Sequence, residues 1–365
     1  MNFKLQGLDH YEKGFLKDYW KDYDPKKDEP TVLGVSISSS NICNYKCIYC
    51  YAGTQRPLKN ELSLEEQQGI LTQAAELGAK TVVICGDGEP SMDKNLLGIV
   101  SHAAKLNMFS IVVTNAAIFG DDELAKKIHG MDGKAVLENL FENNASLIVK
   151  FESIDPDIYD LIVGVPGAYQ KFRKSIDRIK EAGFNKTTES DDGVVTRLAF
   201  SAVIMKNNID QLVSMKNFSD ESNAQFICKL PSLVGRALEN IDNMFEVSKY
   251  EEIRKELFGY TAKRETLMVD TPRCMAWHYG PCIDVSGEIR ECYTSACPEN
   301  KRIGNIRESS LKDLVKKKYE LYDSSINDFC PVKTRINKEF EQSGMAKLWN
   351  VKEENINMNE KILGF

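Results

Sequence analysis

Six short apolar runs, separated by stretches long enough for helices, are the feature that most restricts how this chain can fold. Strands that alternate with amphipathic helices predict right-handed βαβ units and a parallel sheet. Six units are too few for a closed eight-stranded barrel, so we expect an α/β fold with a partial, TIM-like (β/α)6 barrel. The expected strands are residues 31–38, 81–85, 109–115, 145–153, 197–205 and 224–230.

The connecting helices have recognisable ends. Ser63, with Glu66 three residues later, has the pattern of a capping box, and Gly78 suits the other end of that helix. Apolar residues at helical spacing predict a second helix over 96–104 and an extra helical stretch at 131–144. Functional groups on such a sheet gather where the strands end and the loops begin.

Charge and hydropathy exclude some classes of partner. The formal net charge of −7 argues against sequence-independent binding of nucleic acid, which needs a basic surface. The short lysine run at 316–318 is interpreted as a solvated helix face. The chain has no run of about eighteen apolar residues and no signal-peptide pattern at its start. We therefore expect no membrane partner and a cytoplasmic location.

Ten cysteines form two groups and two isolated residues. In a cytosolic chain, clustered cysteines indicate metal binding or catalysis more often than disulfides. Three lie within residues 43–50 and five within 274–330. The isolated Cys85 and Cys228 are compatible with ordinary buried thiols in strands.

The first group, Cys43, Cys47 and Cys50, has the spacing C-x₃-C-x₂-C in a short loop after the first expected strand. Thiolates are the ligands of iron–sulfur clusters, and three of them leave the fourth iron of a cubane open to a small molecule. The alternative is a zinc site completed by residues elsewhere, although zinc sites usually pair cysteines as two C-x₂-C halves.

With this spacing, an aromatic Tyr49 before the last cysteine and the strand pattern that follows, residues 33–235 resemble the radical S-adenosylmethionine (SAM) superfamily. The resemblance implies a [4Fe–4S] cluster on the three cysteines and SAM bound at its open iron. It also implies reductive cleavage of SAM to a 5′-deoxyadenosyl radical, which takes a hydrogen atom from a substrate. The electron would come from a donor such as flavodoxin or ferredoxin.

The resemblance also implies which residues contact SAM. The Gly-Asp-Gly-Glu-Pro turn corresponds to the family's Gly-Gly-Glu-Pro-like turn, whose backbone and glutamate receive the methionine amine. Asp87 departs from that pattern and leaves open which carbonyl meets the ligand. The implied residues are Gly86, Asp87, Gly88 and Glu89 after the second strand, Thr114 and Asn115 after the third, and Ser153 after the fourth.

The second cysteine group surrounds a hairpin pattern centred on Ser286-Gly287. It resembles the SPASM domain, or its shortened twitch form, which carries auxiliary iron–sulfur clusters. The cysteine count limits the expectation to one auxiliary [4Fe–4S] cluster, and four thiolates would also suit a structural zinc. The expected ligands are Cys274, Cys282, Cys292 and Cys330, with Cys297 as the alternative fourth ligand.

These patterns divide the chain into five parts. We expect an N-terminal extension, the partial barrel, a linker helix, the auxiliary-cluster domain and a helical tail. Their bounds are residues 1–32, 33–245, 246–269, 270–335 and 336–365.

An auxiliary cluster could accept an electron from a substrate radical, so the expected reaction is a two-electron oxidation, either dehydrogenation or bond formation. Only about thirty residues precede the barrel, which favours a small molecule or a leader-independent peptide as substrate. One alternative is redox-neutral epimerisation with Cys228 as hydrogen donor. Another is an iron–sulfur electron carrier or redox sensor without turnover, for which neither the barrel nor the glycine-rich turn is needed.

Overall fold

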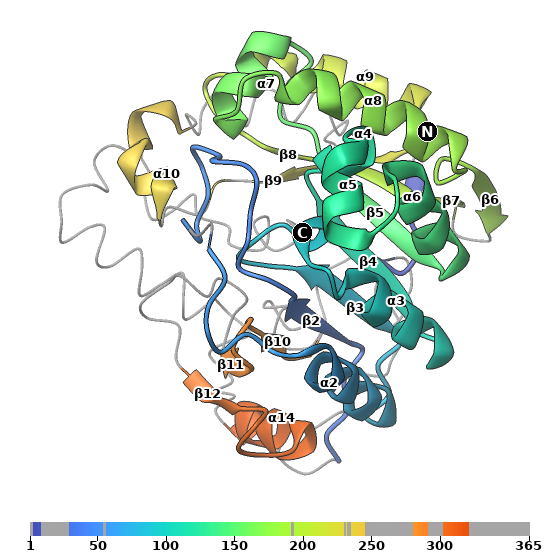
Figure 1. Ribbon diagram of the computed structural model, residues 1–365, viewed down its shortest axis with the longest axis vertical. Helices are drawn as coiled ribbons and strands as arrows, with labels where there is room; N and C mark the ends of the chain where they lie inside the picture. The colour runs from blue at the N-terminus through green and yellow to red at the C-terminus, as the bar shows by residue number, and fades with distance from the viewer. Residues whose placement is uncertain are drawn as a thin grey trace, which may run out of the picture.

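The computed structural model describes residues 3–8, 29–53, 56–190, 193–229, 231, 235–244, 280–290 and 302–320. Its centre is a nine-stranded sheet with the order β12-β11-β10-β2-β3-β4-β5-β8-β9 (Figure 1). The six strands from β2 to β9 run parallel, and each lies within one of the expected runs, so the predicted α/β fold is confirmed. They are β2 Gly34–Ser38, β3 Thr81–Cys85, β4 Phe109–Thr114, β5 Ala145–Lys150, β8 Leu198–Val203 and β9 Gln225–Lys229.

Helices connect these strands, and the first begins as its sequence predicts. The Ser63 hydroxyl accepts the Glu66 N–H at 3.2 Å, and the Glu66 carboxylate accepts the Ser63 N–H at 2.7 Å. None of the described helices is long and apolar enough to cross a membrane. The helices are α2 Leu64–Glu76, α3 Leu96–Lys105, α4 Ala117–Gly120, α5 Asp122–His129, α6 Gly133–Glu142, α7 Pro156–Val163, α8 Ala168–Glu181, α9 Leu212–Glu221 and α10 Arg236–Glu239, with 3-10 turns η2 Pro90–Met92, η3 Ile209–Gln211 and η4 Ile241–Asn243.

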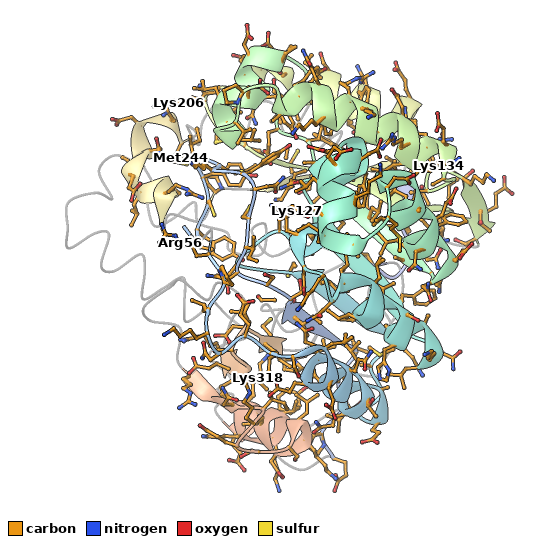
Figure 2. The ribbon with its side chains drawn as sticks, viewed as in Figure 1. Arg56, Lys127, Lys134, Lys206, Met244 and Lys318 are labelled. Atoms are coloured by element: carbon orange, nitrogen blue, oxygen red, sulfur yellow. The ribbon has the colours of Figure 1, made fainter. Side chains whose placement is uncertain are left out.

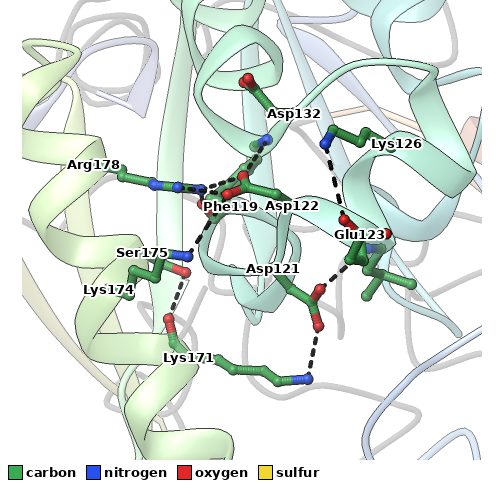
Figure 3. A network of polar contacts seen from close by, with 12 residues as sticks. Phe119, Asp121, Asp122, Glu123, Lys126, Asp132, Lys171, Lys174, Ser175 and Arg178 are labelled. Atoms are coloured by element: carbon green, nitrogen blue, oxygen red, sulfur yellow. Dashed lines mark hydrogen bonds and ion pairs between the residues drawn. The ribbon is translucent and has the colours of Figure 1, made fainter.

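The extra helical stretch is longer than expected and consists of α4, α5 and α6. A network of ion pairs holds it against α8 (Figure 3). Arg178 contacts both carboxylate oxygens of Asp122, at 2.6 and 2.8 Å, and donates to the Phe119 carbonyl at 2.7 Å. Lys171 pairs with Asp121 at 2.8 Å. The Arg178 guanidinium holds the pKa of Asp122 well below its usual range, so this carboxylate stays charged near neutral pH.

The two faces of the parallel strands carry separate apolar clusters. Because successive strand residues point to opposite faces, Val82 packs with the helices while Val83 packs on the inner face with Ile111. Leu5 from the amino-terminal segment joins the inner cluster, and its N–H donates to the Gln225 side chain at 2.9 Å. Burying a leucine side chain stabilises a fold by about 1.5–3 kcal/mol. The segment thus covers the inner face near the amino ends of the strands, opposite the loops expected to hold the site.

A second sheet, with the order β1-β7-β6, has no counterpart among the expected strands. Its strands are β1 Phe3–Leu5, β6 Thr187–Ser190 and β7 Gly193–Thr196. β6 is mostly exposed and has the sequence Thr-Thr-Glu-Ser, so it lacks the apolar alternation that identifies a half-buried strand.

The carboxy-terminal hairpin extends the sheet of the barrel. As expected, Ser286-Gly287 lies between β10 Cys282–Ile283 and β11 Glu288–Arg290, which are antiparallel. β10 also pairs in parallel with β2, which brings Cys282 opposite Ser36. β12 Arg302–Asn305 and α14 Leu311–Glu320 follow. The linker at 246–269 and the tail at 336–365 lie outside the described residues, so the division into domains stays a prediction.

The interpretation of the lysine run as a solvated face is wrong for Lys318. This side chain, which is labelled in Figure 2, is buried. Its Nζ donates to the Gly280 carbonyl at 2.9 Å. A Cβ at Gly280 would lie 1.9 Å from the Gly34 carbonyl oxygen, so the chain can approach β2 here only with glycine.

Arg307 links the segment after β12 to the start of α2. Its guanidinium contacts both carboxylate oxygens of Glu66, at 2.5 and 2.9 Å, and donates to the carbonyls of Asn60 and Glu61. The same carboxylate completes the capping box of α2. One side chain therefore connects two segments 241 residues apart.

Replacement of Arg307 by alanine is expected to lower the free energy of unfolding by about 1 kcal/mol at neutral pH, because the pair is partly exposed. The Arg307 guanidinium lowers the pKa of Glu66 from 4.5 to about 2. A lowered acid pKa adds stability that is present above the unfolded value and is lost as pH falls through the folded value. The difference between wild type and variant should therefore shrink between pH 4.5 and about 2 in thermal unfolding.

Lys126→Ala is the control, because it removes a 3.9 Å ion pair with Glu123 in which both side chains are exposed. It should change stability little at any pH. An equal loss of unfolding free energy in both variants would contradict a stabilising role for the Arg307–Glu66 pair. An effect of Arg307→Ala that does not change with pH would contradict it as well.

Candidate metal centre

Cys43, Cys47 and Cys50 share one loop at the carboxyl end of β2, and all three side chains are partly buried. Burial raises the pKa of Cys43 to about 12, and Glu89 and Cys50 add to the rise. Burial also raises the pKa of Cys47, with further contributions from Glu152 and the other two thiols. The thiols thus lie within electrostatic reach of one another, and a bound cationic centre would favour their deprotonated form.

Three soft thiol donors from one loop fit an iron–sulfur cluster with one open iron. Within the described part of the chain, no three cysteine, histidine or acidic side chains are arranged to hold a single metal ion. The assignment of Cys43, Cys47 and Cys50 as ligands therefore rests on the chemistry of the donor set.

Two backbone N–H groups of the cysteine loop donate to carbonyl groups at the end of α7. Lys46 N–H donates to the Val163 carbonyl and Ile48 N–H donates to the Ile162 carbonyl, both at 2.9 Å. Gly164 follows with φ 68°, and a Cβ there would lie 2.8 Å from the Lys46 carbonyl oxygen. The end of α7 can therefore lie directly on the loop only because residue 164 is glycine.

The carbonyl groups of the same loop are bound by the segment that contains α10, which lies beside the loop in Figure 1. Arg236 donates its backbone N–H to the Cys50 carbonyl at 2.9 Å and its Nε–H to the Cys47 carbonyl at 3.1 Å. Asn240 Nδ2 donates to the Ile48 carbonyl at 3.3 Å. Sequence analysis missed Arg236 and Asn240, because neither belongs to a motif and both are about 190 residues from the loop.

The Gly-Asp-Gly-Glu-Pro turn packs directly on the residues before Cys43. Gly88 N–H donates to the Ser40 carbonyl at 3.0 Å, and Glu89 N–H donates to the Ile42 carbonyl at 2.7 Å. A Cβ on Gly88 would lie 2.4 Å from the Ile42 carbonyl oxygen. Position 88 therefore requires glycine, because any Cβ would collide with the backbone before Cys43.

Glu89 links this turn to the tip of β4. Its buried carboxylate accepts Ser91 N–H at 3.0 Å, Ser91 Oγ at 2.7 Å, Asn115 N–H at 2.7 Å and the Thr114 hydroxyl. Burial raises the pKa of Glu89, and these hydrogen bonds oppose the rise. The carboxylate therefore orders Thr114 and Asn115, while its expected contact with the methionine amine stays a prediction.

Two further contacts connect strand tips to the site. Asn115 Nδ2 donates to the side chain of Asn44, inside the cysteine loop, at 2.8 Å. The Tyr49 hydroxyl donates to Glu152, whose other oxygen accepts the Val203 N–H at 3.0 Å. Sequence analysis missed Asn44 and Glu152, although each adjoins a residue that it identified.

Ser153 lies beside Glu152 at the end of β5 and is fully buried. Its hydroxyl donates to Gln211 Oε1 at 2.6 Å and accepts the Asp155 N–H at 2.9 Å. These bonds hold the turn before α7. A contact between Ser153 and SAM stays a prediction.

The isolated cysteines face opposite sides of the sheet. Cys228 packs with the cluster that includes the helices, and burial raises its pKa to about 12. Cys85 packs with the inner cluster, and its Sγ lies 3.3 Å from Ser36 Oγ. Cys228 is the second-last residue of β9, and its packing directs the thiol toward the helices.

Of the second cysteine group, only Cys282 falls within the described residues. It lines a small pocket where the hairpin meets the carboxyl ends of β2 and β3. The pocket is lined by Ser36, Ser38, Tyr51, Cys85, Gly86, Cys282, Ile283, Asp284, Glu288 and Arg290. Cys274, Cys292, Cys297 and Cys330 lie outside the described residues, so the auxiliary ligand set stays a prediction.

A family model described as the Radical SAM superfamily matches residues 37–194. The chain is 26% identical to Fe-coproporphyrin III synthase of Methanosarcina barkeri over 190 residues, 51% of this chain and 40% of that protein. It is 24% identical to PqqA peptide cyclase of Xanthomonas oryzae pv. oryzae over 303 residues, 78% of this chain and 74% of that protein.

A solved structure of Streptococcus suis SuiB bound to precursor peptide SuiA is similar to this chain. The TM-score is 0.61 at 18% identity, with 82% of this chain and 66% of that chain covered. The same protein has also been solved bound to S-adenosylmethionine. At this identity the likeness shows a shared fold.

Gly88→Ala is expected to displace the cysteine loop, because the added Cβ would meet the backbone of residues 40 and 42. The variant should bind less iron after anaerobic reconstitution and melt at a lower temperature. Gly69→Ala is the control, since a Cβ at that position of α2 meets nothing within 4 Å. Wild-type iron content in Gly88→Ala would contradict the close packing of turn and loop.

Proposed function

Because the chain belongs to the radical SAM superfamily, we propose that it holds a [4Fe–4S] cluster on Cys43, Cys47 and Cys50 and oxidises its substrate by hydrogen-atom abstraction. When bound, the cluster and SAM together supply a 5′-deoxyadenosyl radical, which removes a hydrogen atom from an unactivated carbon. The observation that carries the proposal is the direct packing of the glycine-rich turn on the cysteine loop, with Gly88 and Glu89 bonded to residues 40 and 42.

The residues of this chain would act mainly by positioning SAM. Gly86, Asp87, Gly88 and Glu89 form the turn beside the loop, and Glu89 connects that turn to Thr114 and Asn115. Ser153 lies at the tip of a neighbouring strand. A site whose groups are already ordered by hydrogen bonds need not reorganise when the ligand binds, which favours productive geometry.

An auxiliary [4Fe–4S] cluster on Cys274, Cys282, Cys292 and Cys330, with Cys297 as the alternative fourth ligand, would supply an acceptor for the second electron. The position of Cys282 supports this proposal, because it lines the same pocket as Cys85 and Gly86 at the open end of the barrel. A substrate there would lie between the two cysteine groups. This placement favours a net two-electron oxidation.

The proposed substrate is a peptide or a small molecule. PqqA peptide cyclase matches most of this chain, and SuiB was solved with a precursor peptide. The electron would come from a donor such as flavodoxin or ferredoxin. The alternative of epimerisation with Cys228 as hydrogen donor gains no support from the packing of that thiol on the helix side of the sheet.

The cofactor proposal predicts about eight irons per chain after anaerobic reconstitution, and about four when Cys43, Cys47 and Cys50 are all replaced by alanine. With dithionite and SAM, the unmodified protein should release 5′-deoxyadenosine and the triple variant should not. Iron without 5′-deoxyadenosine would favour an electron carrier. About four irons together with zinc in the unmodified protein would reject the auxiliary cluster.

The reaction proposal predicts a product lighter than the substrate by two hydrogens, measured by mass spectrometry. Cys228→Ala should leave that product unchanged and cost about 1 kcal/mol of stability, because the thiol packs with the apolar cluster on the helix side of the sheet. If Cys228 instead donates a hydrogen atom, the product has the mass of the substrate, carries deuterium in heavy water and is lost in Cys228→Ala.

A further inference from the structure

The contact between Arg236 and the cysteine loop brings a positive charge close to the proposed cluster ligands. Gly235 makes this approach possible, since it has φ 60° and a Cβ there would lie 2.3 Å from the Tyr51 carbonyl oxygen. The Arg236 guanidinium then bonds to the carbonyl of Cys47 at 3.1 Å through Nε. A surface arginine could move away, but this side chain is partly buried and bonded to the loop.

The loop that Arg236 contacts also has two buried carboxyl groups as neighbours. Glu89 donates its backbone N–H to the Ile42 carbonyl just before Cys43, and the Glu152 carboxylate accepts the Tyr49 hydroxyl just before Cys50. Arg236 brings a positive charge to this loop through its bonds to the Cys47 and Cys50 carbonyls.

Reduction of a cluster adds one electron, taken from a low-potential donor, and makes the cluster and its ligands more negative by one charge. A nearby fixed cation stabilises the reduced form more than the oxidised form, and the effect is larger where water is partly excluded. Net charge and hydrogen bonding near the sulfurs are among the properties that set the potential of an iron–sulfur cluster. An arginine suits this role because it stays protonated.

We propose that Arg236 raises the reduction potential of the cluster held by Cys43, Cys47 and Cys50, and that its bond to the Cys47 carbonyl positions the charge. The proposal rests on the proposed function, since it requires a cluster on these cysteines. It makes Arg236 a positioning residue, which acts on SAM cleavage through the cluster and not by touching the substrate.

The test is the midpoint potential of the reconstituted full-length protein, measured by dithionite titration with electron paramagnetic resonance. The signal that changes when SAM is added identifies the cluster on the first cysteine group. Arg236→Gln should shift the midpoint to a more negative potential. Arg236→Lys, which keeps the charge, should stay close to the wild type. Neither substitution removes the backbone N–H of residue 236 that donates to the Cys50 carbonyl.

Two control variants separate charge from structure. Asn240→Ala removes side-chain bonds to the Ile48 and Arg236 carbonyls without changing charge, while the backbone N–H of residue 240 can still donate to the Arg236 carbonyl, so the variant should leave the potential unchanged. Lys134→Gln removes a positive charge from α6, on the opposite side of the view from α10 in Figure 2, and should also leave it unchanged. An unshifted Arg236→Gln, or an equal shift in Asn240→Ala, would overturn the proposal.

The remaining outcomes are also decisive. If Arg236→Gln fails to retain iron, the neutral Arg236→Met takes its place: a more negative midpoint supports the role of the charge, and a wild-type midpoint rejects it. If no cluster forms on Cys43, Cys47 and Cys50 in the unmodified protein, the proposed function fails. A cluster that forms but does not respond to Arg236 overturns only the present inference.

Discussion

The arrangement of the site depends on which groups form hydrogen bonds with the backbone of the cysteine loop. Peptide groups in a partly buried loop without helix or strand must find hydrogen-bond partners in other segments. Here α7 accepts the N–H groups of Lys46 and Ile48, and the α10 segment donates to the carbonyls of Cys47, Ile48 and Cys50. The loop is therefore held from two sides, which limits how far its three thiols can move.

The glycine-rich turn gives the site its second fixed part. Gly88 lets two backbones meet at a distance that any side chain would prevent. Glu89 then uses its buried carboxylate to hold the tip of β4, through Thr114 and Asn115. A buried carboxylate is costly unless it is fully hydrogen-bonded, and four donors within the chain meet that requirement. The result is an ordered polar surface beside the proposed cluster.

The sheet also decides which cysteines can share a site. Cys85 and Cys282 come from strands on either side of β2 and line one pocket, whereas Cys228 packs with the helices. Because successive strand residues alternate between faces, a shift of one position would reverse each of these assignments. The parallel pairing of β10 with β2 brings the hairpin of the second cysteine group to the edge of the barrel strands. That pairing places Cys282 beside Ser36 of β2, the strand that leads into the cysteine loop.

The sequence by itself determined the local features of this protein. The six parallel strands, the capping box at Ser63 and the hairpin turn at Ser286 follow from periodicity and turn chemistry, which act over a few residues. Only the tertiary structure decided that Arg236 meets the cysteine loop, that Lys318 is buried and that Cys228 faces the helices. These outcomes depend on contacts between segments far apart in the chain and on which face of the sheet each strand residue points to. Local sequence patterns do not encode such contacts, because they arise only when the elements pack together.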